Sequence, residues 1–357
     1  MSWFSRLSLR GRTVLVGSVV SLALVAVASA VQIPYVAVGP GVTFNVLGSA
    51  NGHAVISFTG EDIPASVNEP TSGHLNMTTI SVKDHMTLFA ALGFWAAGDY
   101  SIAPREDFFP PGQSVEQVNQ TNAQLFSDSQ SAAEIAALRY LDYPSVTYVG
   151  NIAEDSPSSG LLEPQDQITA IDGTAVTTLP TLLAALNGTT PGQTVKVTVI
   201  RDGKTVDVKV TLGENPNNPG HGYLGIVPAE RPTAPFTPHI ALQNIGGPSA
   251  GLMFTLGLID KLTPGELTGG VFIAGTGEIQ PGATSDQKSQ VGAIGGILMK
   301  MIGARDAGAT WFLVPAPNCQ EAVTRIPAGL QLAKVATLND AVTAVKAIAE
   351  GKPPIGC

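Results

Sequence analysis

The sequence predicts a multidomain α+β protein that begins with a transmembrane helix, and three observations support this. An uncharged apolar stretch occupies residues 13–33, period-two strands and turns fill residues 142–214, and apolar helical stretches alternate with short strands over residues 239–357. A small mixed α+β region, residues 35–141, precedes the β-rich segment, and a linker rich in proline, asparagine and glycine, residues 215–238, follows it. A chain of 357 residues is long enough for two or three such domains.

Composition excludes several classes of protein. Hydrophobic residues make up 44% of the chain and charged residues 13%, which supports buried cores and argues against a disordered chain. The net charge of −9 is spread along the sequence without a basic block, so we expect no nucleic-acid partner. The two cysteines, Cys319 and Cys357, are too few for a zinc site. In an oxidising compartment they could pair, although the sequence does not give the distance between them.

The first residues carry the charge pattern of a membrane anchor. Three arginines precede the uncharged stretch and none follows it closely: Arg6, Arg10 and Arg12. As a helix, residues 13–33 would span about 30 Å, which matches the hydrocarbon core of a bilayer. The positive charge before the stretch predicts that residues 1–12 lie in the cytoplasm. We therefore expect a single-pass protein of the cell membrane whose functional part is extracytoplasmic.

A cleaved signal peptide is the alternative to a retained anchor. Ala28-Ser29-Ala30 is a small-x-small site after which a signal peptidase could cut. The apolar run is long for the core of a signal peptide, which favours the anchor. Both interpretations export the protein.

Residues 35–141 contain no cluster of side chains that could carry chemistry. The period-two pattern of residues 74–82 predicts a strand, and the prolines of residues 104–112 predict a loop. The alanine and leucine spacing of residues 127–141 predicts a helix. We expect this region to be a small domain or a connector.

Residues 142–214 show a regular order of elements. A turn at residues 155–161 is expected to lead into a short helix, and Asp202-Gly203 is a strong signal for a hairpin. The other predicted elements are strands at residues 146–149, 167–171, 195–200 and 206–212 and a helix at residues 179–186.

This order of elements resembles a PDZ domain of the bacterial protease type. The strand-turn signature of that family, G-D-x-I-x-x-I-D-G, is similar to residues 165–173, where Gln165 replaces the first glycine. The resemblance implies that a protein or peptide segment binds as an added strand at the edge of the sheet. A domain that only spaces its neighbours is the alternative, because a fold does not by itself establish a function.

A candidate nucleophile lies in the last third of the chain. Residues 246–251, Gly-Gly-Pro-Ser-Ala-Gly, form a tight turn that runs into an apolar helical stretch, residues 252–262. Ser249 would lie at the helix N-terminus, where backbone N–H groups near Gly247 and Ala250 could stabilise an oxyanion. Taken alone, this turn favours an ordinary helix cap, because serine is common at that position.

A candidate base follows the serine on a second predicted helix. Lys300 shares the apolar face of this helix with Ile297, Met301, Ala304 and Gly308. Burial disfavours the ammonium form and lowers the pKa of a lysine, so that a neutral amine could take a proton from a serine hydroxyl. The alternative is that the lysine extends its charge to water along its aliphatic stem.

Three motifs resemble the proteolytic domain of Lon proteases, in the order of that family. They are Gly-Pro-Ser-Ala-Gly at residues 247–251, Gly-Thr-Gly-Glu-Ile at residues 275–279, and the glycine-rich run that ends in the lysine at residues 291–300. The resemblance implies that Ser249 is the nucleophile, that Lys300 is the general base and that Thr276 orients the lysine. The helix end and buried strand at residues 307–315 also fit.

The complete layout resembles the membrane-anchored, Lon-like serine proteases of bacteria that carry a PDZ domain. It implies an ATP-independent endopeptidase that cleaves exported or membrane-associated proteins, with the PDZ-like domain recruiting the substrate. Lon-type domains often form rings, so the resemblance also suggests a homo-oligomer. A non-catalytic, membrane-anchored PDZ scaffold is the alternative, and cleavage of its own chain alone is a third interpretation.

Two features depart from the Lon pattern. Asn244-Ile245 stands before the glycines where Lon proteases usually have an acidic residue, and the loop between Ile279 and Val291 is longer than usual. Lys288 in that loop has a polar, turn-like setting and is a poor candidate for the base.

The sequence predicts no cofactor. It has no G-x-x-x-x-G-K-[ST] loop with which to couple ATP hydrolysis to unfolding, and no H-E-x-x-H motif. Its five histidines show no metal-ligand spacing, so we expect no metal site: His53, His74, His85, His221 and His239.

Overall fold

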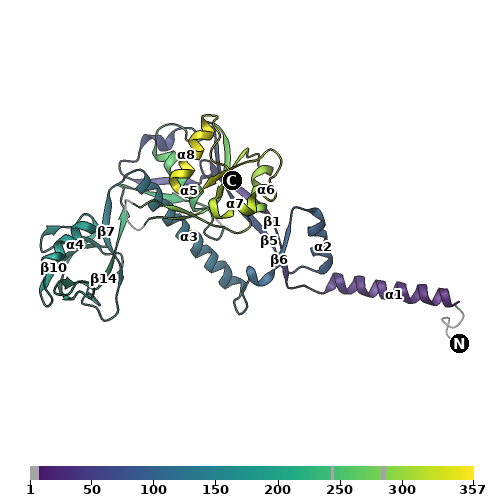
Figure 1. The fold of residues 1–357 in the computed structure, drawn as a ribbon, viewed down its shortest axis with the longest axis horizontal. Helices are drawn as coiled ribbons and strands as arrows, with labels where there is room; N and C mark the ends of the chain where they lie inside the picture. The colour runs from purple at the N-terminus through teal and green to yellow at the C-terminus, as the bar shows by residue number, and fades with distance from the viewer. Residues whose placement is uncertain (1–7, 243–244, 283–286) are drawn as a thin grey trace.

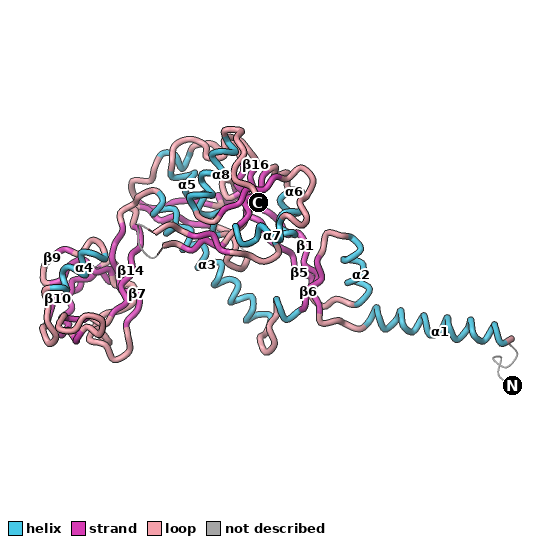
Figure 2. Tube along the Cα trace, viewed as in Figure 1, coloured by secondary structure: helices cyan, strands magenta, loops and turns pink. Residues whose placement is uncertain are grey.

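The structure, a computed structural model, describes residues 8–242, 245–282 and 287–357. Figure 1 shows three parts: an N-terminal helix that projects from the molecule, a central body, and a smaller lobe on the far side of the body. Figure 2 shows strands joined by loops beside the helix α4 in the lobe, whereas helices and strands mix throughout the body. The expected mixed helix-and-strand architecture with an apolar N-terminal helix is therefore confirmed. The predictions that concern Arg6, Asn244 and residues 283–286 lie outside the described residues.

The N-terminal helix α1 (Leu9–Ala30) is long and apolar enough to cross a membrane. Its first turn is capped by Ser8, whose side chain accepts a hydrogen bond from the Gly11 N–H. The helix ends at Ala30, three residues earlier than the predicted span. Ile33, which follows the helix, donates its N–H to the Met86 carbonyl at 2.8 Å, and this hydrogen bond ties the segment after α1 to the body.

A six-stranded mixed sheet forms the centre of the body. Its order is β20 (Gln331–Val335), β19 (Trp311–Pro315), β16 (Phe272–Gly275), β5 (His74–Lys83), β1 (Tyr35–Asn45) and β6 (Ser101–Pro104). The first four strands are parallel, and β1 runs antiparallel between β5 and β6. The expectation of a separate small domain at residues 35–141 is therefore wrong. Residues 35–141 supply three strands of this sheet, and the last third of the chain supplies the other three.

Helices cover both faces of this sheet. On one face lie α5 (Gly251–Leu262), α8 (Leu338–Ala349) and α3 (Val115–Tyr140), which is longer than predicted. On the other face lie α6 (Ile297–Asp306) and the short α7 (Cys319–Ala322). Adjacent residues of β16 point to opposite sides, because Ile273 packs with α5 and Ala274 packs with α6. The strands are thus apolar on both faces, as is typical of a covered parallel sheet.

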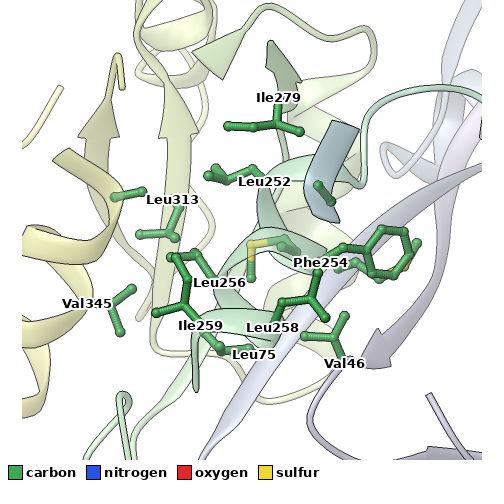
Figure 3. Close-up of a cluster of buried hydrophobic side chains, with 14 of the residues drawn as sticks. Val46, Leu75, Leu252, Phe254, Leu256, Leu258, Ile259, Ile279, Leu313 and Val345 are labelled. Atoms are coloured by element: carbon green, nitrogen blue, oxygen red, sulfur yellow. The ribbon is translucent and has the colours of Figure 1, made fainter. Parts of the chain in front are cut away.

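Helix α5 is the innermost helix. Figure 3 shows its apolar side chains surrounded by residues of the sheet and of α8, among them Leu75, Leu313 and Val345. Eleven of its residues are buried, because α3 and α8 cover the sides that the sheet does not reach. A helix that is apolar all round is expected in such a position.

The lobe consists of a sheet and one helix around a core of its own. The sheet has the order β11 (Lys204–Thr211), β10 (Thr194–Arg201), β8 (Gln167–Ile171), β7 (Ser145–Ile152) and β14 (Ile226–Pro232), with β9 (Thr174–Ala175) beside β8 and with α4 (Leu179–Asn187) packed on it. The predicted hairpin is confirmed, since Asp202 and Gly203 both have positive φ between β10 and β11. The prediction of a short helix after the turn at residues 155–161 is wrong, because this segment forms only turns.

The predicted linker at residues 215–238 is also wrong. It contains β14, which pairs with β7, and most of β15 (Phe236–Ile240), which pairs with β4 (Ile56–Gly60) of the body. Its prolines suggested a linker, but Pro228 and Pro232 are tolerated because β14 lies at the edge of its sheet. The chain enters and leaves the lobe side by side, since the Thr233 N–H donates to the Pro144 carbonyl at 2.7 Å.

Shorter elements complete the fold. They are β2 (Ser49–Ala50), β3 (His53–Ala54), η2 (Ala65–Asn68), α2 (Leu88–Ala97), η3 (Arg105–Asp107), β12 (Gly213–Glu214), β13 (Gly222–Tyr223), β17 (Glu278–Gln280), β18 (Gln290–Gly292) and η4 (Ala316–Asn318). Cys319 and Cys357, whose pairing the sequence left open, form a disulfide that joins α7 to the C-terminal residue, with Cα atoms 5.3 Å apart.

Candidate active site

Ser249 lies in a tight turn that leads into α5. Gly247 has a φ of +87°, a left-handed conformation that suits glycine, and Ala250 is the N-cap residue of α5. Among the described residues no side chain caps this helix through a hydrogen bond, so Ser249 is not the ordinary helix cap that the sequence alone allowed. Its half-buried hydroxyl instead receives a hydrogen bond from Lys300.

Two residues of α3 hold this turn from one side. The Gly247 N–H donates to the Asn122 carbonyl oxygen at 2.9 Å, and the Ser129 hydroxyl donates to the Pro248 carbonyl oxygen at 2.9 Å. Ser129 is buried, with 5% of its surface exposed. Sequence reasoning did not single it out, because it is one of three serines in α3 and forms no recognisable motif. Its placement beside the Gly-Pro-Ser turn is visible only in three dimensions.

The residues that follow β16 hold the turn from the other side. Thr276 Oγ1 donates to the Ser249 carbonyl oxygen at 3.0 Å, and the Gly277 N–H donates to the same oxygen at 2.9 Å. A side chain at Gly277 would have its Cβ 2.8 Å from Val291 Cγ1, which is too close. The carbonyl end of β16, a parallel strand, thus meets the start of α5 at this point, and polar groups commonly gather at such an end.

Lys300 reaches this point from the opposite face of the sheet. It lies one turn into α6, whose N-cap residue is Gly296, with a positive φ of 70°. A Cβ at Gly296 would lie 2.9 Å from Ile80 Cγ2, and one at Gly303 would lie 3.1 Å from the Gly41 carbonyl oxygen. Both glycines therefore let α6 lie close against β1 and β5, and this close packing carries the lysine stem into the interior.

The Lys300 amine is buried against two hydroxyl groups. Its Nζ lies 2.7 Å from Ser249 Oγ and 3.0 Å from Thr276 Oγ1. Only 3% of the lysine surface is exposed, so its stem does not carry the charge to water as the alternative interpretation required. Burial lowers the pKa of Lys300 from its ordinary value to about 7. Near neutral pH a large fraction of the amine is therefore unprotonated and able to accept a proton.

The two predicted oxyanion residues have different surroundings. The Gly247 N–H is occupied by the Asn122 carbonyl, so its assignment as an oxyanion donor is wrong, and Gly247 serves the turn instead. The Ala250 N–H makes no hydrogen bond within the described ranges, and it lies at the N-terminal end of α5. A free N–H beside a serine hydroxyl at a helix start is a suitable donor for a developing negative charge.

The structure thus brings Ser249, Lys300 and Thr276 into direct contact and leaves Lys288 outside this contact. Lys288 is exposed, and it lies beside Ser289 in the segment before β18. Across residues 8–242, 245–282 and 287–357, no group of three or more histidine, cysteine, aspartate or glutamate side chains could hold a metal ion.

Comparison with known proteins finds similarity in the part of the chain that forms the lobe. The family model described as PDZ domain matches residues 112–212. The chain contains a PDZ domain. The match reaches back into α3, although the core of the PDZ lobe is built from the strands and helix that follow it, and it ends before β14, which completes the PDZ sheet. No curated protein matches the chain.

Several solved structures are similar to this part of the chain. The PDZ domain of the SdrC-like protein from Listeria innocua is 26% identical, with 23% of this chain and 92% of that chain covered and a TM-score of 0.22. Its counterpart from Listeria monocytogenes is 26% identical, with 23% and 85% covered and a TM-score of 0.22. A solution structure from Geobacillus thermodenitrificans is 32% identical, with 23% and 94% covered and a TM-score of 0.21.

Among the described strands, β11 and β14 lie at the two edges of the PDZ sheet. Among the described strands β14 pairs only with β7, and α4 packs beside it. Val227 on β14 and Leu183 on α4 are 58% and 52% exposed. The carboxylate of Glu230 accepts a hydrogen bond from the Leu179 N–H at 2.6 Å and joins the strand to the start of the helix. PDZ domains bind proteins or peptides by adding a strand at such an edge.

Proposed function

We propose that the chain is a serine endopeptidase in which Ser249 and Lys300 form a catalytic dyad. The observation that carries this proposal is the 2.7 Å contact between the Ser249 hydroxyl and a buried lysine amine whose pKa is about 7. The similarity of the three sequence motifs to Lon proteases supports the same roles. The absence of a phosphate-binding motif supports an activity that does not need ATP.

The proposed reaction is an acyl transfer through a covalent intermediate. The neutral Lys300 amine takes the proton of the Ser249 hydroxyl while the oxygen attacks the carbonyl carbon of the scissile peptide bond. The Ala250 N–H stabilises the resulting oxyanion. The Lys300 ammonium then gives its proton to the leaving amine, and the acyl-enzyme forms. A water molecule, deprotonated by the same amine, releases the acyl group and restores the serine.

Thr276 has a positioning role in this proposal. Its Oγ1 lies between the Lys300 amine and the Ser249 carbonyl oxygen, with hydrogen bonds of 3.0 Å to each. It therefore holds the base and the backbone of the nucleophile at a constant separation. Thr276 is completely buried, so water does not compete for these contacts.

The PDZ domain recruits the substrate in this proposal. An extended segment of an exported or membrane-associated protein would add to the free edge of β14, beside the exposed Val227 and Leu183. Recruitment of this kind suits a protease without an ATPase, because it concentrates unfolded segments near the site.

The proposed location is the cell membrane, with the uncharged part of α1, from Thr13 onward, as a single span, residues 1–12 in the cytoplasm and the remainder outside. The arginines before this uncharged part, Arg6, Arg10 and Arg12, support this orientation. The Cys319–Cys357 disulfide supports an oxidising compartment for the body. Assembly into a homo-oligomer is a prediction from the Lon resemblance, and the mass of the full chain in detergent tests it.

The decisive experiment is cleavage of an unfolded protein by the purified full chain without ATP. Ser249→Ala and Lys300→Ala are compared with the parent, and Lys288→Ala is the matched control because it removes an exposed lysine outside the dyad. Circular dichroism establishes that each variant is folded. We expect cleavage by the parent and by Lys288→Ala, and none by the dyad variants. Cleavage that survives both dyad substitutions contradicts the proposal. A folded parent that binds the substrate without cutting it would instead indicate the non-catalytic PDZ scaffold.

A further inference from the structure

Helix α2 carries a row of large apolar side chains on its outer surface. The exposed fractions are 46% for Leu88, 45% for Phe89, 50% for Leu92 and 70% for Trp95. Leu88, Leu92 and Trp95 follow the i, i+4, i+7 spacing that places side chains on one face of a helix. The helix contains no charged residue between Leu88 and Ala97. Such a cluster is larger than the single exposed apolar residues that ordinary surfaces show.

The body holds this helix in a defined orientation. The opposite face, with Ala91 buried and Ala90 and Phe94 half-buried, packs against Ala37 of β1. Phe94 also contacts Tyr100, with ring centroids 4.5 Å apart. Thr87 caps the first turn, and Gly98 ends the helix in a left-handed conformation. The large apolar residues therefore point outward because the helix is anchored by its other face.

The same helix lies at the end of α1. Residues Gln32 and Thr87 form a β-bridge, and the Ile33 N–H donates to the Met86 carbonyl at 2.8 Å. Helix α2 contacts α1, and Figure 1 shows it near the end of α1 that joins the body. These contacts hold α2 at the end of the apolar helix α1. If α1 crosses a bilayer, α2 then lies at the surface of that bilayer.

We propose that α2 is a membrane-interfacial helix, and that its face of Leu88, Phe89, Leu92 and Trp95 is inserted in the outer leaflet beside α1. This inference rests on the proposed anchor. The occupant is lipid because the apolar face continues the apolar surface of α1, which is exposed along its length. An apolar helical face enters the interface by about 5–10 Å, and tryptophan is enriched at that level. Insertion of α2 in addition to α1 would hold the body at one orientation to the membrane.

Quenching of tryptophan fluorescence by brominated lipid tests this inference. The full chain with Trp3→Phe is placed in vesicles of phosphatidylcholine and phosphatidylglycerol, with or without bromine near the headgroup end of the acyl chains. The matched control also carries Trp95→Phe, so that only Trp311 of the body emits. We expect the fractional quenching in the Trp95-containing chain to exceed that of the control about twofold or more, because the interfacial depth brings Trp95 to the bromine atoms. Equal quenching in the two chains overturns the proposal.

Two further measurements separate the causes of a negative result. Extraction of the vesicles at alkaline pH reports on the anchor alone. A chain that resists extraction while Trp95 stays unquenched shows that α1 is in the membrane and that α2 is not. Emission of Trp95 that is blue-shifted but unquenched, and that moves to longer wavelength on dilution, shows that a second copy covers the face, which also overturns the proposal. Neither measurement depends on peptidase activity.

Discussion

The Ser129 hydroxyl, on a helix from the first half of the chain, donates a hydrogen bond of 2.9 Å to the carbonyl oxygen of Pro248, the residue before the candidate nucleophile. Ser129 thus fixes a turn that lies far from it in sequence. A Cβ at Gly251 would lie 2.9 Å from the same hydroxyl oxygen, so α3 and α5 meet closely here. The candidate site therefore depends on α3 as much as on the motifs that resemble Lon proteases.

Replacement of Ser129 by alanine tests this dependence. The substitution leaves the Pro248 carbonyl without its donor, and a lost buried hydrogen bond costs about 1–3 kcal/mol. We expect the proposed peptidase activity to fall mainly in kcat, with KM little changed, because the nucleophile loses its orientation. Ser131→Ala is the control, since Ser131 is exposed on the same helix. Urea unfolding and steady-state kinetics measure both effects, and equal behaviour of the two variants would show that the contact is unimportant.

The pH dependence of cleavage follows from the pKa of Lys300. The proposed base must be neutral, and its pKa is about 7. We therefore expect kcat/KM for a peptide substrate to be low in acid, to rise through about pH 7 and to reach a plateau above it. An activity that is constant from acid to alkaline pH would argue against the lysine as base. Full activity in Lys300→Arg, whose guanidinium stays protonated, would argue against it as well.

We also expect the buried Lys300 amine to lower the free energy of unfolding at neutral pH. Its pKa is lowered from the ordinary lysine value of 10.5 to about 7 in the folded chain, so between these values the unfolded chain binds the extra proton. Stability therefore rises with pH across this window, and it is lowest below about pH 7. Lys300→Met removes the buried amine and should raise the free energy of unfolding at pH 7 by about 1 kcal/mol or more. Urea unfolding at pH 7 and at pH 10 measures this difference, which should shrink at the higher pH. A Lys300→Met variant that is less stable than the parent at pH 7 would contradict this expectation.

Substrate recruitment can be separated from peptide-bond cleavage. Val227→Lys places a charge on the free edge of the PDZ sheet, at a side chain that is 58% exposed, so the fold should be retained. We expect slower cleavage of a long unfolded protein and unchanged cleavage of a short peptide that does not need recruitment. Val323→Lys is the matched control, because Val323 is 47% exposed and lies just after α7 in the body. Loss of short-peptide cleavage in Val227→Lys alone would mean that the substitution disturbs the site itself.

Local sequence patterns predicted most of the individual elements. The hairpin at Asp202-Gly203 and the helix that carries Lys300 are where turn chemistry and apolar spacing placed them. The proximity of Ser249 and Lys300 followed only from a family resemblance, since 51 residues separate them. The sequence did not predict β14, because the prolines of this strand are also typical of a linker. It did not predict the end of α1 either, because an apolar run does not show at which residue a helix ends.

By itself, the sequence determined the local conformations, because apolar periodicity and glycine turns act between residues that are close together in the chain. Only the tertiary structure decided which distant segments meet. The pairing of β5 with β16, the hydrogen bond from Ser129 to Pro248 and the burial that lowers the pKa of Lys300 depend on contacts between residues far apart in the chain. Such contacts leave no local pattern, because any apolar strand can pair with another and a buried serine has no preferred spacing. Their geometry is set by the packing of the complete body, in which the first and last thirds of the chain share one sheet.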